Sequence, residues 1–290
     1  MELIKGETCP SVWLKAVEHL TGCPAHEDFD VFLGIATPTI YSASDRVILD
    51  TVDAFLRDHG GSRVETVAET LFPLSDYLHH GAKGVYEVYP KRIQHIRSAR
   101  SNDRRWGTYA LRLLEPRLDP KKRKYVPLAA LVTKIRDHGK YRAAHELNVG
   151  PFEDDIEIYD PDRDRLRPYG GPCLSHLSFK VYDGRVRLNA TYRSHFYVQR
   201  LLGNLIGLAR LQFFVANESG LEVGPLTINS TFARLDAGGG GGGGDGGRWG
   251  EGDITRLIAA CRKAADAEAT LPVQAVVAPA AGHTPLPSAA

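Results

Sequence analysis

The feature that most constrains the fold is a pair of strand-like runs joined by an Asp-Gly pair in the second half of the chain. Residues 174–182 and 184–193 carry many β-branched and aromatic side chains, and Asp183-Gly184 between them is a strong β-hairpin signal. The apolar run Leu201–Ala216 follows, and its length favours a buried helix over a strand. We therefore expect a sheet with a long helix packed on it.

Patterns along the rest of the chain predict further helices and strands. Helical patterns cover residues 11–20, 44–59, 64–72, 91–105, 126–138 and 253–267. Strand patterns cover residues 30–35, 106–114, 142–147 and 221–235. Because helices gather in the first half and strands in the second, we predict an α+β fold with a large mixed or antiparallel sheet packed with helices.

An unbroken run of glycines, Gly238–Gly244, interrupts the chain near its end. A phosphate-binding glycine loop needs a preceding strand, a following helix and a Lys-Ser/Thr end, which fit poorly here, so a flexible insertion is favoured. We expect a domain over residues 1–236, a flexible glycine-rich insertion over 237–252, a helix over 253–269 that completes the domain, and a disordered Ala/Pro tail over 270–290.

Composition argues against several classes of function. The 36 basic residues nearly balance the 35 acidic ones, which gives no global attraction to a nucleic acid polymer or a membrane. No apolar run approaches the ~20 residues of a membrane-spanning helix, and the N-terminus has no apolar signal core. The 4 cysteines are scattered and form no C-x-x-C pair, so we expect a reduced, cytoplasmic protein without a metal site.

Cys173, at the mouth of the first hairpin strand, is a candidate nucleophile. A cysteine nucleophile needs thiolate character, which a nearby cation supplies. The hairpin arms are nearly equal in length, so strand pairing would bring Arg193 back beside Cys173. His176 would point to the opposite face of the strand, which weakens a Cys-His hydrolase interpretation. On spacing alone, a buried structural cysteine and a surface arginine are the competing interpretation.

A longer pattern surrounds this cysteine. Pro172-Cys173 opens a strand that ends in Asp183-Gly184, a second strand ends in Arg193-Ser194, and Asn204 opens the apolar helix. Upstream lie the segments "VAETLF", "RWGTYALR" and "KYRAAHEL". Together these motifs resemble the thymidylate synthase superfamily, which includes the pyrimidine nucleotide hydroxymethylases. The resemblance implies a thymidylate-synthase-like fold and an obligate homodimer.

The resemblance implies a chemical role for the hairpin residues. Cys173 would add as a thiolate to C6 of a pyrimidine nucleotide, and C5 would then attack a one-carbon unit. Arg193 would activate Cys173 and bind the 5′-phosphate, and Ser194 would donate a hydroxyl to it. Arg142 would reach across the dimer to the partner's phosphate, although a surface charge is the competing interpretation. The implied activity is C5 methylation or hydroxymethylation of a free nucleotide in specialised metabolism.

Base and sugar contacts are also implied. Asn204 would read O4 and N3 of the base, which favours uracil because an amide both donates and accepts. Glu69 would act through water as general acid-base near the C4 oxygen. The family's deoxyribose-binding motif is changed here, and Arg234 and Asp236 could bind a sugar differently. The competing interpretations are a helix-start residue for Asn204 and a surface carboxylate for Glu69.

The second substrate is where the chain departs from the family. The family's one-carbon donor is 5,10-methylenetetrahydrofolate, and the aspartate that holds its pterin is replaced here by Phe196. Phe196, Tyr197 and Phe213 would offer apolar and stacking surface to whichever second substrate is used. Two alternatives to the C5 transferase stay open: a folate-independent cysteine enzyme on the same scaffold, and a non-catalytic nucleotide-binding homologue.

Overall fold

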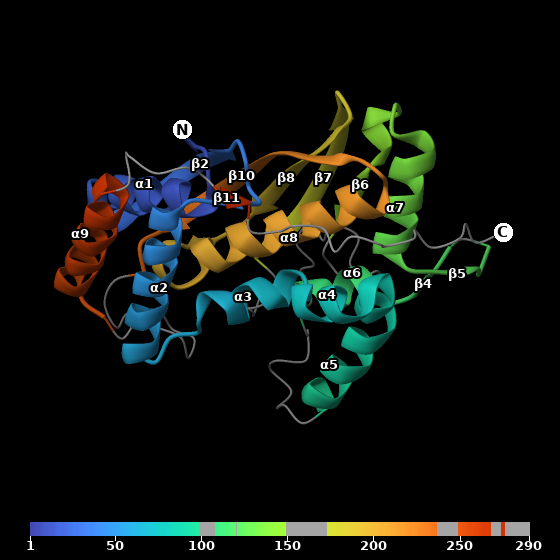
Figure 1. The fold of residues 1–290 in the computed structure, drawn as a ribbon, viewed down its shortest axis with the longest axis horizontal. Coiled ribbons are helices and arrows are strands. Elements are labelled where there is room, and N and C mark those ends of the chain that lie inside the picture. Colours follow the sequence, from blue (N-terminus) through green and yellow to red (C-terminus); the bar gives the residue numbers. More distant parts are fainter. Residues whose placement is uncertain (99–107, 120, 149–172, 237–248, 268–273, 276–290) are drawn as a thin grey trace, which may run out of the picture.

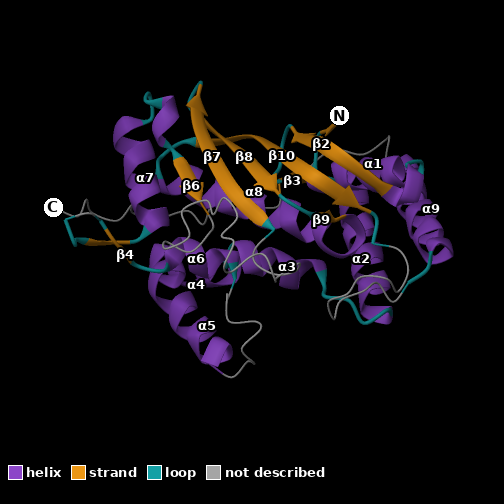
Figure 2. Cartoon of the chain, turned by 180° about the vertical axis from the view of Figure 1, so that it is seen from behind, coloured by secondary structure: helices purple, strands orange, loops and turns teal. Residues whose placement is uncertain are grey.

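A large sheet forms one layer of the protein, and helices pack against one of its faces (Figure 1). The computed structural model describes residues 1–98, 108–119, 121–148, 173–236, 249–267 and 274–275. Seen from behind, the strands lie in front of helix α8 (Leu202–Glu218) (Figure 2). The predicted α+β fold with a large sheet packed with helices is thereby confirmed.

The main sheet is mixed. Within the described residues it has 7 strands in the order β1-β2-β10-β8-β7-β6, with β9 paired to β10. The bounds are β1 (Glu2–Gly6), β2 (Glu27–Ile35), β6 (Glu146–Asn148), β7 (Leu174–Tyr182), β8 (Arg185–Tyr192), β9 (His195–Phe196) and β10 (Glu222–Arg234). β8 and β10 run parallel, with α8 between them in the chain, as a crossover requires.

The Asp-Gly hairpin forms as predicted. β7 and β8 pair antiparallel, and Tyr182 lies opposite Arg185 at the closed end. Asp183 and Gly184 have φ of +50° and +68°, the left-handed backbone that a two-residue hairpin turn needs and that Asp-Gly adopts readily. The open end of the hairpin is therefore the end that carries Cys173 and Arg193.

The helices follow most of the predicted patterns. Their bounds are α1 (Cys9–Thr21), α2 (Ala43–Asp58), α3 (Val64–Leu71), α4 (Leu74–Lys83), α5 (Tyr89–Ser98), α6 (Tyr109–Leu114), α7 (Pro127–His138), α8 and α9 (Glu251–Ala267). Single turns are η1 (Pro24–His26), η2 (Gly84–Val88), η4 (Arg142–Ala144) and η5 (Tyr197–Leu201). Short strands are β3 (Ile40–Tyr41), β4 (Arg117–Leu118), β5 (Lys124–Tyr125) and β11 (Gln274–Ala275).

Helix α8 is the centre of the core, between the sheet and α3. Two glycines let α3 approach it, because a Cβ on Gly203 or Gly207 would lie only 2.5 or 2.6 Å from a carbon of α3. On the sheet side, the buried Gln212 amide donates hydrogen bonds of 2.7 Å to the carbonyl oxygens of Val186 and Gly224. These contacts fix α8, and with it Asn204, against both layers.

Some predicted elements are wrong. Residues 109–114 form helix α6 instead of a strand, because Thr108 caps the helix by accepting a hydrogen bond from the Leu111 N–H. Helix α1 begins at Cys9 and is capped by Thr8, so it starts two residues before the predicted position 11. The segment predicted as strand 142–147 begins instead with the turn η4, and β6 starts only at Glu146.

Residues 237–248 of the predicted insertion and most of the predicted tail lie outside the described residues, whereas Trp249 is buried and α9 begins at Glu251, within the predicted insertion. Within the tail, Gln274–Ala275 form β11 and pair with β3. The disorder predicted for 270–290 and the flexibility predicted for 237–252 stay predictions. The helix predicted over 253–269 corresponds to α9, whose Leu257 and Cys261 are buried.

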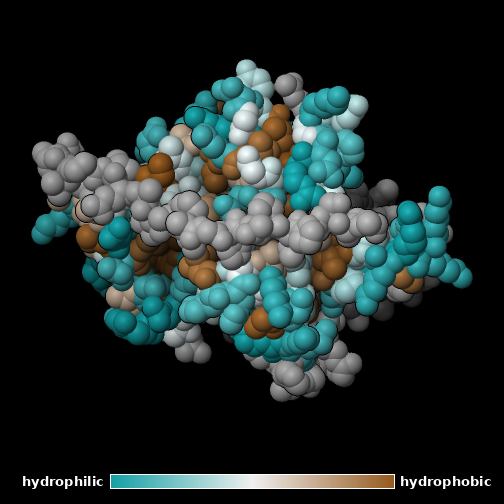
Figure 3. All heavy atoms as spheres, turned by 45° about the vertical axis from the view of Figure 1, so that its right-hand side comes forward, coloured by the Kyte–Doolittle hydropathy of each residue, from teal (hydrophilic) through white to brown (hydrophobic). Residues whose placement is uncertain are grey.

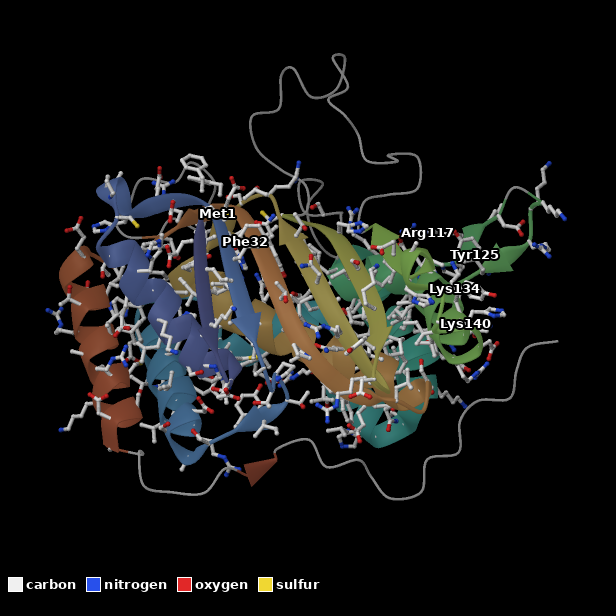
Figure 4. All side chains as sticks on the ribbon, turned by 90° about the horizontal axis from the view of Figure 1, so that it is seen from above. Met1, Phe32, Arg117, Tyr125, Lys134 and Lys140 are labelled. Carbon is white, nitrogen blue, oxygen red and sulfur yellow. The ribbon has the colours of Figure 1, made fainter. Side chains whose placement is uncertain are left out.

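The sheet face that lies away from α8 is mostly polar over β8 and β10, but it carries the apolar Leu3 and Phe32 where β1 pairs with β2. Along β2, Val31 and Leu33 are buried on the α8 side, so Phe32 between them lies on the other face, which Figure 4 views from above. Its neighbours on β8 and β10 are small polar residues, including Thr191 and Asn229. On the side of the molecule that Figure 3 shows, turned 45° from Figure 1, hydrophobic residues are interspersed with hydrophilic ones. Among the described helices, none has the length and apolar character that crossing a membrane requires.

Candidate functional site

The site is built at the open end of the β7–β8 hairpin. Cys173 directly precedes β7 and is half-buried. The Arg193 N–H donates a 2.8 Å hydrogen bond to the Cys173 carbonyl oxygen, so the hairpin brings these two residues together as their spacing predicts. Ser194 follows and is half-buried, while Arg193 itself is exposed.

A tyrosine that the sequence did not predict as a site residue supports the cysteine backbone. The Tyr109 hydroxyl accepts hydrogen bonds from the N–H groups of Cys173 and Leu174, at 3.1 and 3.4 Å. Tyr109 is the first residue of α6, within "RWGTYALR", where a strand pattern was expected. A helical interpretation of that segment would have been needed to place the hydroxyl beside the nucleophile.

Burial and two arginines act in opposite directions on the Cys173 thiol. Removal from water raises the pKa of Cys173, and the positive charges of Arg193 and Arg200 lower it by smaller amounts, so the net pKa is above the ordinary value. The Arg193 charge acts on the thiol pKa in the predicted direction, but burial outweighs it, and activation of Cys173 by Arg193 stays a prediction. Arg200, in the turn η5, is a second cation near the thiol that sequence reasoning missed.

Asn204 is linked to the hairpin through a buried histidine. The Asn204 amide nitrogen lies 2.9 Å from His195 Nε2, and His195 Nδ1 lies 3.0 Å from the Ser230 hydroxyl. His195 also stacks on Tyr192, the residue before Arg193, with ring centroids 4.0 Å apart and planes 9° apart. Cys173, Tyr192, His195 and Asn204 thus belong to one packed group.

His195 is the hydrogen-bond partner of the Asn204 amide. Burial lowers the pKa of His195 to about 3, so the ring is neutral near pH 7, with one nitrogen that donates and one that accepts. With the Asn204 amide nitrogen toward Nε2, that ring nitrogen accepts from Asn204 and Nδ1–H donates to Ser230. Within the described residues, the other amide hydrogen and the carbonyl oxygen of Asn204 are then available to a ligand.

Glu69 lies on α3, on the side that packs against α8. Its carboxylate accepts a 3.4 Å hydrogen bond from the Ser75 N–H and lies 3.7 Å from Arg210 Nη1 of α8. Burial raises the pKa of Glu69, although Ser75 and Arg210 act against this. The neighbouring Glu65 makes the closer, two-pronged ion pair with Arg210, at 2.8 and 2.7 Å.

A contact series leads from the Glu69 region toward the cysteine. The negative charge of Glu69 is one of the influences that raise the pKa of Tyr89. The Tyr89 hydroxyl lies 2.6 Å from the hydroxyl of Thr108, which caps the helix that begins with Tyr109. Tyr109 in turn contacts Cys173, as described above. The general acid-base role of Glu69 stays a prediction.

The two predicted sugar-binding residues already have protein partners. Arg234 Nε lies 3.3 Å from Glu27 Oε1, across the β10–β2 pair. The buried Asp236 carboxylate accepts hydrogen bonds from the N–H groups of Val198 and Gln199, at 2.7 and 3.0 Å. Asp236 therefore stabilises the start of the turn η5 that carries Arg200. Their predicted sugar contact stays a prediction.

Three further expectations have different outcomes. Arg142 opens η4, but its side chain lies outside what the structure describes. The expected stacking surface is wrong for Tyr197 and Phe213, because both side chains are buried in the core; only Phe196, with 36% exposure, is accessible. His176 pairs with Glu146 of β6 at 2.8 Å, away from the thiol, in agreement with its exclusion as a catalytic partner.

Comparisons with known proteins match part of the chain. No family model matches the sequence. It is 42% identical over 64 residues to a protein of Methanothermobacter thermautotrophicus named "Putative thymidylate synthase", and 38% identical over 64 residues to a protein of the same name from Methanosarcina acetivorans. Each match covers 22% of this chain, and 29% and 30% of the respective relative. These matches confirm the resemblance to the thymidylate synthase superfamily over that stretch.

The structure was also compared with solved structures. Thermostable thymidylate synthase A from Bacillus subtilis aligns with a TM-score of 0.46 and 13% sequence identity, over 79% of each chain.

Proposed function

We propose that this protein transfers a one-carbon unit to C5 of a pyrimidine nucleotide, with Cys173 as the nucleophile that adds to C6. The observation that carries the proposal is the packed group at the hairpin end. In this group the charges of Arg193 and Arg200 act on the thiol, and the Asn204 amide contacts His195, which stacks on Tyr192. The partial similarity to proteins named as thymidylate synthases supports the same chemistry.

The reaction begins with activation of the thiol. In the ligand-free protein the raised pKa keeps Cys173 protonated near neutral pH. The thiolate that does form is stabilised by the two arginines, because opposite charges favour the ionised form. The sulfur electron pair forms a bond to C6, and the C5=C6 electrons move toward the C4 oxygen. C5 thereby becomes an enolate carbon.

The enolate then attacks an electrophile at the oxidation level of formaldehyde. C5 forms the new carbon–carbon bond, a base removes the C5 proton, and elimination of the thiolate restores the C5=C6 bond. With formaldehyde itself the product is a hydroxymethyl group, and atoms and electrons balance without a reductant. A methyl product needs two more electrons, so the product distinguishes the two reactions.

Asn204 selects the base in this proposal. Its remaining N–H donates to O4 and its carbonyl oxygen accepts from N3–H, which matches uracil. His195 holds the amide in this orientation as its Nδ1–H tautomer, because the opposite orientation would require the Nε2–H tautomer. Cytosine offers an acceptor at N3 and a donor at C4, which this orientation opposes. A uracil base is therefore favoured.

Proton transfer at the C4 oxygen is assigned to Glu69 through water. A carboxyl group with a raised pKa is suited to donate as well as accept a proton near neutral pH. Its contact with Arg210 places it beside α8, the helix that also carries Asn204. The proposed role is that of a relay, because the carboxylate reaches the base through solvent.

The family's folate contact does not fit this chain. Phe196 occupies the position of the pterin-binding aspartate, and a phenyl ring offers no acceptor for a pterin N–H. Its 36% exposure provides apolar surface instead. We therefore describe the electrophile only by its chemical class and derive no step through folate.

The phosphate site and the homodimer are part of the proposal. Arg193 and Ser194 would hold the 5′-phosphate, and Arg142 would supply the partner's site across a two-fold axis. The outer face of the sheet is compatible with a second protomer, because small Thr and Asn side chains lie on it beside Phe32. Sedimentation equilibrium should give a dimer; a monomer at assay concentrations would contradict the role of Arg142.

The proposal is tested by tritium release. Purified protein is incubated with 5-tritiated UMP, dUMP, CMP or dCMP and formaldehyde, with and without tetrahydrofolate. Wild-type protein and the control Cys261→Ala should release tritium, and Cys173→Ser should not. Absence of release from every nucleotide, or release that persists in Cys173→Ser, would contradict the proposal. Folate dependence follows from comparing the two conditions.

One alternative function has a specific observation in its favour. The raised pKa of Cys173 is also what an unreactive buried cysteine shows. In that case the protein would bind nucleotides without catalysis. Nucleotide-induced thermal stabilisation that is retained in Cys173→Ser, is lost in Arg193→Ala and occurs without any tritium release would favour this alternative.

A further inference from the structure

Three side chains of metal-binding type meet where helix α1 joins strand β2. His19 lies in the last turn of α1, Cys23 follows the helix, and Asp28 lies in β2. The His19 Nε2 atom is 2.7 Å from Asp28 Oδ2 and 3.4 Å from Cys23 Sγ. All three donor atoms lie within 4.8 Å of one another. Nothing in the proposed reaction uses this group.

Local structure explains why these residues meet. His19 and Cys23 are four positions apart at the end of a helix, a spacing that places two side chains on one face. Ala25 and His26 then adopt left-handed backbone, with φ of 53° and 55°, and this reverses the chain into β2. The His26 carbonyl accepts a 2.9 Å hydrogen bond from the Leu235 N–H, which ties the turn to the end of β10.

The distances suit a tetrahedral ion. Bond lengths of about 2.3 Å to sulfur and about 2.0 Å to nitrogen or oxygen imply ligand separations of about 3.5 Å for N···S and about 3.3 Å for N···O. The observed 3.4 Å between His19 and Cys23 already meets this value. The 2.7 Å contact between His19 and Asp28 must open slightly, as expected when a hydrogen bond is replaced by a shared metal ion.

The charges around the group also favour a cation. The negative charges of Asp28 and Glu2 both act on Cys23. A divalent ion bound by the thiol would displace its proton. The three side chains are partly exposed, so an ion has access to them.

We propose that His19, Cys23 and Asp28 form a binding site for a divalent transition metal of the zinc class, with the fourth position open to water or another ligand. Sulfur and imidazole donors select such metals over magnesium and calcium. The ion would join the end of α1 to β2 in place of the His19–Asp28 hydrogen bond. The sequence did not predict it, because no C-x-x-C pair is present and Asp28 comes from a separate element.

Cobalt(II) titration of the untagged protein, with a phosphine reductant that does not compete for metal, tests the site. Wild-type protein and Cys173→Ala should show a thiolate-to-cobalt charge-transfer band and the visible bands of tetrahedral cobalt. Cys23→Ala should lose the charge-transfer band while its far-ultraviolet circular dichroism matches that of wild type. His19→Ala and Asp28→Asn should weaken binding by at least about tenfold.

Zinc competition against a chromophoric chelator gives the affinity and stoichiometry, which should be one ion per chain. Absence of a thiolate band in wild-type protein would overturn the proposal. A band that persists in Cys23→Ala but disappears in Cys173→Ala would also overturn it, because the metal would then bind at the proposed catalytic thiol.

Discussion

Replacing His195 by glutamine should remove a large part of the acid sensitivity of folding. His195 is buried and its pKa falls from 6.5 to about 3 because burial disfavours the charged ring. The folded pKa is below the unfolded one, so the neutral histidine contributes stability above pH 6.5. That stability is lost as the pH falls from 6.5 toward 3, because only the unfolded chain then binds the proton.

The expected change in the free energy of unfolding follows from the linkage between proton binding and folding. Each pH unit below 6.5 costs about 1.4 kcal/mol, so between pH 7.5 and pH 5.0 this single histidine should lower the free energy of unfolding by about 2 kcal/mol. His195→Gln has no group that titrates in this range. Its free energy of unfolding should therefore depend less steeply on pH, whatever its absolute stability is.

Urea unfolding at both pH values, followed by circular dichroism, measures this difference by linear extrapolation. His79→Gln is the matched control, because His79 is exposed on α4 and should leave the pH dependence as in wild type. Nuclear magnetic resonance of labelled wild-type protein, with the signals assigned, should show that the His195 ring stays neutral at pH 5.0. Identical pH dependence in wild type and His195→Gln, or titration of every histidine above pH 5, would refute the reasoning.

Three further predictions concern residues around the site. Asp236→Ala should lower the free energy of unfolding by about 3 kcal/mol in urea unfolding, because two buried N–H groups lose a charged acceptor. The control Asp58→Ala, at an exposed position, should stay within about 0.5 kcal/mol of wild type. An equally small effect of Asp236→Ala would exclude its role in holding the N–H groups of η5. Tyr109→Phe should lower the free energy of unfolding by about 1–3 kcal/mol, measured in the same way, and an unchanged value would mean that water replaces the hydroxyl. Asn204→Asp should shift tritium release from uracil toward cytosine nucleotides, because a protonated carboxyl donates to N3 and accepts from the C4 amino group. An unchanged ratio of tritium release from uracil and cytosine nucleotides would show that Asn204 does not select the base.

The sequence alone predicted the elements whose signals are local and periodic. The β7–β8 hairpin follows from Asp183-Gly184 and the flanking β-branched runs, and its nearly equal arms predicted the contact between Cys173 and Arg193. Helix α8 follows from an apolar run too long for a strand. These features depend on neighbouring residues and on backbone geometry, so they are readable without the rest of the chain.

Tertiary structure decided the features that depend on residues far apart in the chain. Tyr109 contacts the Cys173 backbone from helix α6, whose local sequence pattern predicts a strand. Burial, a property of the whole core, reverses the expected direction of the Cys173 pKa, and it leaves Tyr197 and Phe213 inaccessible. Asp236, predicted from a motif position, is used by the backbone of η5. Burial and long-range hydrogen bonding depend on how the whole molecule packs. Local sequence patterns could therefore predict the thiol and its arginine as candidates, but they could not predict the residues that surround them.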